Sequence, residues 1–276
     1  MYASLCLVEN SKHSGELIGV HQKLDRTARW LLAKNLSATH GFFPTTKQIL
    51  HFEGTRGPDG LKNKSPGKDE PEHFIQPDHD DGKLIGYVLD HRHNLIQALK
   101  NHNEERAAFE AAWMAHAITD GLTPAHHYPF RKVVDELMTD KDYKRLFGKE
   151  VKGIMRGNSM AQAARNNWLY WGAGGVMTKH IAFEYGVAYA IAPIPYKKMA
   201  PKDFARDNLS APDAKTAFYN SLEKIANLKM YDRFLKKGWN TQLIIETREI
   251  LIPEIVRAIT LAWADSIISA TEKENA

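Results

Sequence analysis

The chain has 276 residues, of which 43% are hydrophobic and 25% charged, a globular composition that excludes wholesale disorder. Its formal net charge of +4 is too small to indicate nucleic-acid binding by itself. The sequence contains no run of about 18 apolar residues that could span a membrane, and its one cysteine, Cys6, excludes an internal disulfide. Histidine is the unusual residue, with 13 copies.

The amino-terminal segment does not look like a secretory signal. Residues 1–8 are apolar, but no basic segment precedes them and the chain turns polar at Glu9. On that basis we expect a cytoplasmic protein, or a sequence that begins after a removed segment.

Helical periodicity dominates the first half of the chain. Apolar residues at helical spacing predict a helix over 18–36, and further helices are predicted over 87–100 and 104–121. Between the first two lies a region rich in glycine and proline, 41–82, which we expect to be a long loop. Loops longer than about 15 residues within a compact domain are usually functional or disordered.

The second half of the chain is also predicted to be helical. A charged, helix-compatible segment precedes an apolar helix over 176–192, and further helices are expected over 216–230 and 241–268. Pro253 should kink or break the last of these. Strand patterns are nearly absent and no repeat is found, so we predict an all-α fold in one domain over 1–276.

The densest group of candidate ligands begins at His116. His116 and Asp120 are four residues apart and share one helix face, and the turn after this helix carries His126 back toward the same end. Imidazole nitrogen and carboxylate oxygen are the ligand mixture of catalytic zinc sites. A hydrogen bond on the helix surface is the alternative interpretation of this pair.

A second pair with the same spacing is His180 and Glu184. The other residues of this helix are mostly apolar, and an unpaired charge there would be costly. A surface hydrogen bond is again the alternative for either pair taken alone. Two such pairs in apolar helices favour a metal site.

The remaining candidates are scattered. Asp59 lies in a turn permitted by glycine, His73 follows the proline-rich stretch, and His21 lies on the buried side of the first helix. Taken singly, Asp59 would be a turn residue and His21 a core histidine.

In this order the eight residues resemble the trinuclear zinc site of the zinc-dependent phospholipase C family, which shares its all-helical fold with fungal single-strand-specific nucleases. The resemblance covers about residues 15–190, and the segment from His73 to Asp78 is also similar. The residues concerned are His21, Asp59, His73, His116, Asp120, His126, His180 and Glu184.

The resemblance implies two to three Zn²⁺ ions per chain. Asp59, His73, His116 and Asp120 would hold the first. The second ion would be held by His126, His180 and Glu184. Asp120 would bridge to a third ion on His21, which the family completes with the mature amino-terminal residue.

The chain departs from the family pattern in two places. Met1 lies 20 residues ahead of His21 and is not the tryptophan that the family carries, and a long insertion over 128–179 separates His126 from His180. The final ligand, Glu184, is closer to the phospholipases than to the nucleases.

The resemblance implies a zinc-dependent phosphodiester hydrolase of phospholipase C type, which cleaves phospholipid head groups with metal-activated water. Asp59 is the candidate catalytic residue because it could orient that water. Phe74 and Tyr128 would pack against a head group or a base, or only against the protein.

The alternatives are a nuclease acting on single-stranded nucleic acid with the same metal core, and a non-catalytic metal-binding protein. Lysines 62, 64, 197 and 198 are expected to be solvated surface, with transient contact to a membrane surface or nucleic acid as the alternative. Although the chain shows no clear signal segment, the resembled family is mostly secreted.

Overall fold

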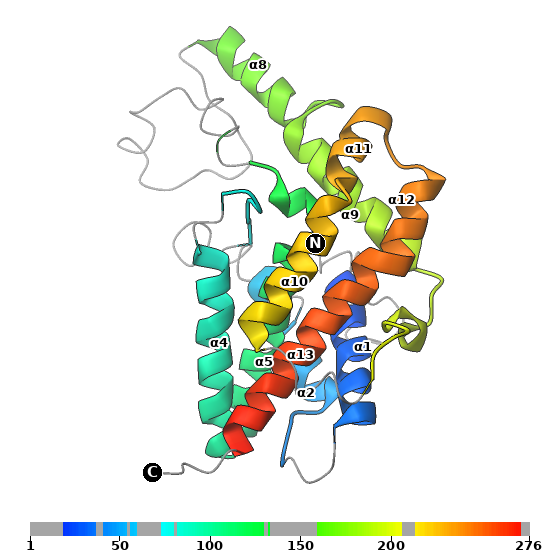
Figure 1. Ribbon diagram of the computed structural model, residues 1–276. Coiled ribbons are helices and arrows are strands. Elements are labelled where there is room, and N and C mark those ends of the chain that lie inside the picture. Colours follow the sequence, from blue (N-terminus) through cyan, green and yellow to red (C-terminus); the bar gives the residue numbers. More distant parts are fainter. Residues whose placement is uncertain are drawn as a thin grey trace.

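The computed structural model describes residues 19–36, 41–53, 56–59, 73–79, 82–129, 132, 159–205 and 213–271. All regular structure within these ranges is helical, which confirms the predicted all-α fold (Figure 1). The elements are α1 (Val20–Asn35), α2 (Thr46–His51), α4 (Lys83–Lys100), α5 (Glu104–Gly121), the 3₁₀ turn η3 (Pro124–His127), α8 (Met160–Trp171), α9 (Val176–Ile191), η4 (Tyr196–Met199), α10 (Ala214–Asn227), α11 (Met230–Lys237), α12 (Thr241–Glu246), the π-helical η6 (Thr247–Leu251) and α13 (Ile252–Thr271). None of the described helices is both long and apolar enough to cross a bilayer.

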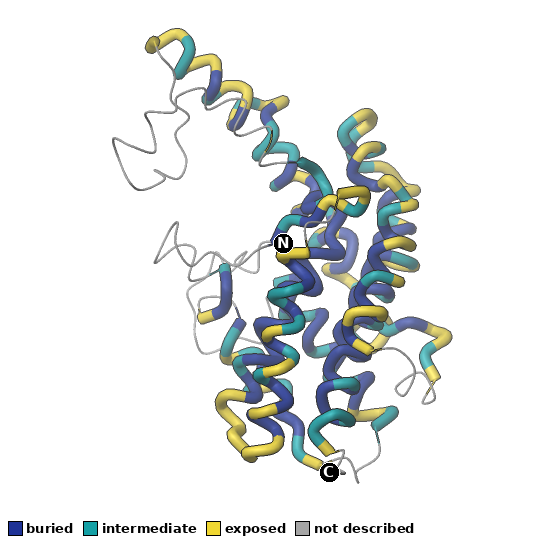
Figure 2. Tube along the Cα trace, turned by 60° about the vertical axis from the view of Figure 1, so that its left-hand side comes forward, coloured by how far each residue is buried: buried dark blue, intermediate teal, exposed yellow. Residues whose placement is uncertain are grey.

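Helix α5 lies at the centre of the helical body. It packs against α1, α2, α4 and α13, and nearly every residue from Ala107 to Gly121 is buried (Figures 1 and 2). The many alanines of α5 allow its neighbours to approach on all sides. The fully buried Trp263 of α13 shows this approach, because its indole Nε1 donates to the Ala111 carbonyl of α5 at 3.1 Å.

The end of α5 is held by close packing at a glycine. A Cβ on Gly121 would lie 2.5 Å from Leu84 of α4 and 2.9 Å from Phe218 of α10, closer than packed atoms allow. Gly121 therefore lets three helices meet directly beyond Asp120, and the chain then turns into η3.

Most predicted helices are confirmed within a turn of their expected ends. Helix α5 has the predicted bounds, α4 begins one turn earlier than predicted, and neither α8 nor α11 was predicted as a separate helix. The expected loop over 41–82 was also too long, since α2 lies within it. Its start has a capping box: Thr45 Oγ1 accepts from the Gln48 backbone, while Gln48 Oε1 accepts from the Thr45 backbone at 2.8 Å.

Pro253 changes the type of helix without ending it. The π-helical turn η6 ends at Leu251, two residues before Pro253, and α13 runs from Ile252 through Pro253 to Thr271. Proline has no N–H to donate and its ring crowds the preceding turn, so a wider turn at this point accommodates it. The predicted kink or break is thus a local π turn.

Of the expected insertion over 128–179, the structure describes residues 128–129, 132 and 159–179, which include α8, the turn that follows it and the start of α9. Helix α8 extends away from the helical body in both views (Figures 1 and 2). Residues 130–131 and 133–158 lie outside the described residues, as do residues 1–18 and 60–72, which include Met1 and part of the predicted loop.

Candidate metal centre

The first group of ligand atoms joins α1, the segment 56–59 and α5. One ligand atom from each of His21, Asp59 and His116 lies within 4.8 Å of the other two. His21 and His116 are buried, and their rings stack with centroids 4.1 Å apart and an interplanar angle of 13°. Two imidazoles and a carboxylate from three separate segments thus meet in one place.

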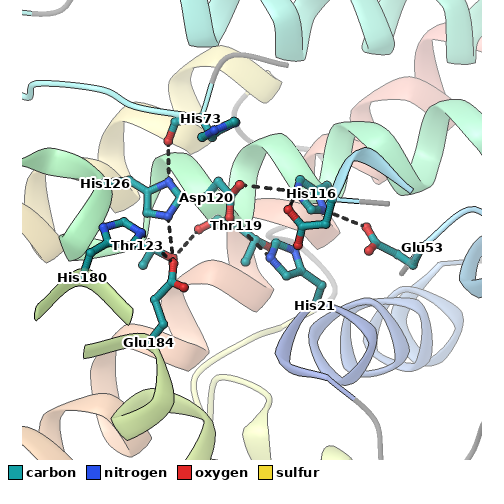
Figure 3. A network of polar contacts seen from close by, with 11 residues as sticks. His21, Glu53, His73, His116, Thr119, Asp120, Thr123, His126, His180 and Glu184 are labelled. Atoms are coloured by element: carbon teal, nitrogen blue, oxygen red, sulfur yellow. Dashed lines mark hydrogen bonds and ion pairs between the residues drawn. The ribbon is translucent and has the colours of Figure 1, made fainter. Parts of the chain in front are cut away.

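Asp120 connects the two histidines of this group. Its Oδ1 lies 3.3 Å from His21 Nε2, and its Oδ2 lies 3.3 Å from His116 Nε2 (Figure 3). The second contact follows from the helix itself, because residues four apart on α5 share a face. The contact with His21 depends on how α1 packs against α5.

Glu53 orients His116 from outside the group. Glu53 Oε1 lies 3.2 Å from His116 Nδ1, while His116 Nε2 faces Asp59 and Asp120. Histidines that bind metals commonly donate their second ring nitrogen to a carboxylate in this way. Glu53 is not among the site residues predicted from the sequence, although it lies only six residues before Asp59.

Gly57 permits this stretch to fold back on itself. A Cβ on Gly57 would lie 2.8 Å from the Phe52 carbonyl oxygen and 2.9 Å from Glu53 Cα. Because no side chain intervenes, Glu53 and Asp59 can approach His116 from the same segment. Glycine at this predicted turn is therefore required by close packing.

The electrostatics of the first group favour a cation. Burial by itself lowers the pKa of His116, but the carboxylates of Glu53 and Asp120 outweigh it and raise the pKa to about 10. Glu53 and Asp120 are themselves almost fully buried. Without a metal ion, a proton on His116 offsets part of this negative charge.

The second group joins η3 and α9. One ligand atom from each of His126, His180 and Glu184 lies within 4.8 Å of the others, and all three residues are buried. Glu184 Oε1 is 3.0 Å from His126 Nε2 and 3.2 Å from His180 Nε2 (Figure 3). The predicted pair on α9 therefore meets the histidine that follows α5.

A backbone contact sets the orientation of His126. Its Nδ1 donates to the His73 carbonyl oxygen at 2.6 Å, which leaves Nε2 facing Glu184. Burial lowers the pKa of His126, so its neutral, metal-binding form is favoured. Phe74 stacks on this ring with a centroid distance of 5.0 Å, while Tyr128 packs against Tyr231.

Both groups fit a metal ion. Each offers two imidazole nitrogens and one carboxylate oxygen, which would leave a fourth tetrahedral position open. His116 Nδ1 faces the Glu53 carboxylate, and His126 Nδ1 faces the His73 carbonyl. Metal-binding histidines commonly direct the ring nitrogen that does not bind the metal to such a group.

The arrangement differs in three respects from the expected ligand sets. Asp120, expected as a ligand of the first ion, contacts His21 and His116 but belongs to neither group of the described residues. His21, expected at a third ion, lies in the same group as Asp59 and His116. His73, expected in the first set, belongs to neither group of the described residues, and its ring lies beside His126 at a centroid distance of 5.9 Å. The second set has the expected three members.

Helix α1 explains why His21 takes this place. It packs against α5, α13 and α2, and its buried face includes His21 beside Val20 and Leu24. The sequence already placed His21 on this buried side, but it could not show which helix the face would meet.

Comparisons of the chain with protein-family models, with curated proteins and with solved structures give no match.

Proposed function

We propose that the protein is a zinc-dependent phosphodiester hydrolase of phospholipase C type, which cleaves phospholipid head groups. The observation that supports this most directly is the meeting of two three-ligand groups at the carboxyl end of α5, one on each side of Asp120 (Figure 3). The resemblance of the ordered ligands to the phospholipase C family supports the choice of zinc and substrate.

The chemistry needs both metal ions and correctly placed protein groups. Two zinc ions, when bound, neutralise the charge of a phosphodiester and activate water. His21 and His116 would hold one ion with Asp59, and Asp120 keeps their rings in place. A second ion would be held by His126, His180 and Glu184.

Asp59 is proposed as the catalytic residue that orients the attacking water. Among the members of the two groups it is the most exposed: its side chain is 12% exposed, against 9% for that of His180. Its side chain is therefore partly exposed to solvent, while its Oδ1 lies 3.8 Å from His116 Nε2. A carboxylate in this position can accept a hydrogen bond from water.

Hydrolysis assays on zinc-loaded protein test the proposal. A soluble chromogenic phosphodiester, phosphatidylcholine and single-stranded DNA are compared, and we expect the first two to be cleaved. Asp59→Asn should lower the rate by about 10²-fold, whereas the exposed Asp78→Asn should leave it unchanged. Cleavage of DNA without cleavage of lipid would identify a nuclease, and absence of all turnover would identify a metal-binding protein without catalysis.

A further inference from the structure

Large apolar side chains are exposed mainly on α8 and α9. Trp168 is 70% exposed, Tyr189 is 78% exposed and Met160, at the start of α8, is 92% exposed. Leu169, Trp171 and Tyr185 complete the set, which we call the aromatic face. Outside these two helices, the described residues include one more such side chain, Ile245 of α12. Concentrated exposure of this kind marks an interaction surface.

Helix α8 exposes several large apolar side chains to solvent, although its Tyr170 is buried. Asn166 and Tyr170 are buried, whereas Trp168 and Leu169 face solvent. A surface helix ordinarily turns its apolar side chains toward the protein. The main contact of α8 is with α9, so the helical body leaves the aromatic face uncovered.

The turn between α8 and α9 is built to hold the two helices together. Thr178 Oγ1 donates to the Trp171 carbonyl at 2.8 Å, and the Gly175 backbone donates to Gly172 at 2.7 Å. A Cβ on Gly175 would lie 2.4 Å from the Tyr170 carbonyl oxygen, so only glycine fits. The aromatic face is therefore presented on a defined pair of helices.

The charge around the aromatic face is positive. Helices α8 and α9 carry Arg165 and Lys179, and their one acidic residue, Glu184, is buried in the second ligand group. Helix α11, which contacts α9 and lies at the same end of the molecule as α8 in Figure 1, carries the exposed Lys236 and Lys237 and one exposed acidic residue, Asp232. A partner with negative charge is thus favoured over a second copy, whose own cations would be repelled.

We propose that the aromatic face docks on the surface of an anionic phospholipid bilayer. Tryptophan and tyrosine favour the boundary between head groups and acyl chains, because their rings are apolar and their N–H or O–H groups remain hydrated. A helix with exposed Trp and Leu lies in this boundary, and nearby cations are attracted by anionic lipids.

Docking would bring α9 to the lipid surface together with its metal ligands. Tyr185 directly follows Glu184 in the sequence, and His180 is about 7.5 Å from Tyr185 along the helix axis at 1.5 Å per residue. The inference rests on the proposed function, since a phospholipase must bind the surface that contains its substrate.

Vesicle flotation of the full chain tests the docking without any turnover. Vesicles of phosphatidylcholine mixed with phosphatidylglycerol are compared with pure phosphatidylcholine, in the presence of a chelator. We expect the wild type to bind the mixed vesicles. The double variant Trp168→Ala/Trp171→Ala should bind them with about tenfold lower affinity. Ile245→Ala is the matched control, because it removes an exposed apolar side chain outside the aromatic face.

Three results would overturn the inference. In the first, the wild-type protein does not bind the mixed vesicles. In the second, the double variant binds them as tightly as the wild type. In the third, sedimentation shows that the wild type is a dimer and that the double variant is not. Circular dichroism checks that the double variant is folded, and Trp168→Phe alone should retain most of the binding. Hydrolysis of a soluble phosphodiester by wild-type protein is measured separately, so a failed enzyme proposal would show no turnover while vesicle binding persists.

Discussion

His21 stacks on His116 at a ring-centroid distance of 4.1 Å, and Asp120 contacts both rings with a different carboxylate oxygen. The two histidines come from α1 and α5, so the packing of these helices determines whether their nitrogens can share an ion. Asp120 therefore places a negative charge beside both rings.

Asp120→Asn should lower the metal content by at least one ion per chain and abolish phosphodiester hydrolysis. The amide keeps the shape of the side chain but removes the negative charge beside His21 and His116. Elemental analysis of the purified variant measures the loss, with the exposed Asp90→Asn as control. Full metal content with near-normal turnover in Asp120→Asn would contradict the role given to this carboxylate.

His180→Gln should remove one ion and leave the first group loaded. His180 contacts Glu184 at 3.2 Å and has no part in the group formed by His21, Asp59 and His116. The same elemental analysis, performed beside Asp120→Asn, compares the two sites. Loss of all metal from His180→Gln would mean that the two groups do not bind independently.

Glu53→Gln should weaken metal binding by about 10- to 100-fold without removing a direct ligand. Glu53 contacts the outer nitrogen of His116, and such outer carboxylates orient the ring and increase its basicity. Competition with a chromogenic chelator measures the affinity. Glu105→Gln, an exposed change at the start of α5, is the control, and equal affinities in the two variants would refute the prediction.

Metal affinity of the first group should rise with pH by about tenfold per unit between pH 6.5 and 8.5. The pKa of His116 is raised to about 10, so the metal-free protein carries a proton there that the ion must displace. The stability of the metal-free protein should change with pH in the opposite direction. The proton on His116 stabilises this fold fully below about pH 6.5, and its contribution is lost as the pH rises toward 10. Calorimetry in buffers of different ionisation enthalpy measures the released proton, and pH-independent binding would exclude this mechanism.

Removal of metal should lower the melting temperature by several degrees. An ion present at about 100 times its dissociation constant stabilises the fold by about 2.7 kcal/mol, and about 1 kcal/mol corresponds to about 2–4 °C in a chain of this size. Thermal unfolding before and after chelation measures the shift, and re-addition of zinc should restore it. An unchanged melting temperature after complete chelation would show that the ligand groups do not need a cation.

The sequence alone was sufficient for the features that arise within one helix. Apolar periodicity and end signals located α5 with its observed bounds, and α4 and α9 to within one turn. The pairs His116–Asp120 and His180–Glu184 were also identifiable, because helix geometry brings residues four apart to one face whatever surrounds them. The capping box formed by Thr45 and Gln48 is another local signal, and it indicates the start of α2.

The membership of the first ligand group and the place of His73 were decided only by the tertiary structure. The stacking of His21 on His116, the contact of Glu53 with the same ring and the place of His73 beside His126 all join segments far apart in the chain. Spacing along a helix carries no information about such contacts. They depend on how the small residues of α5 let α1 approach and on how Gly57 turns the preceding segment back, and these are properties of packing between elements.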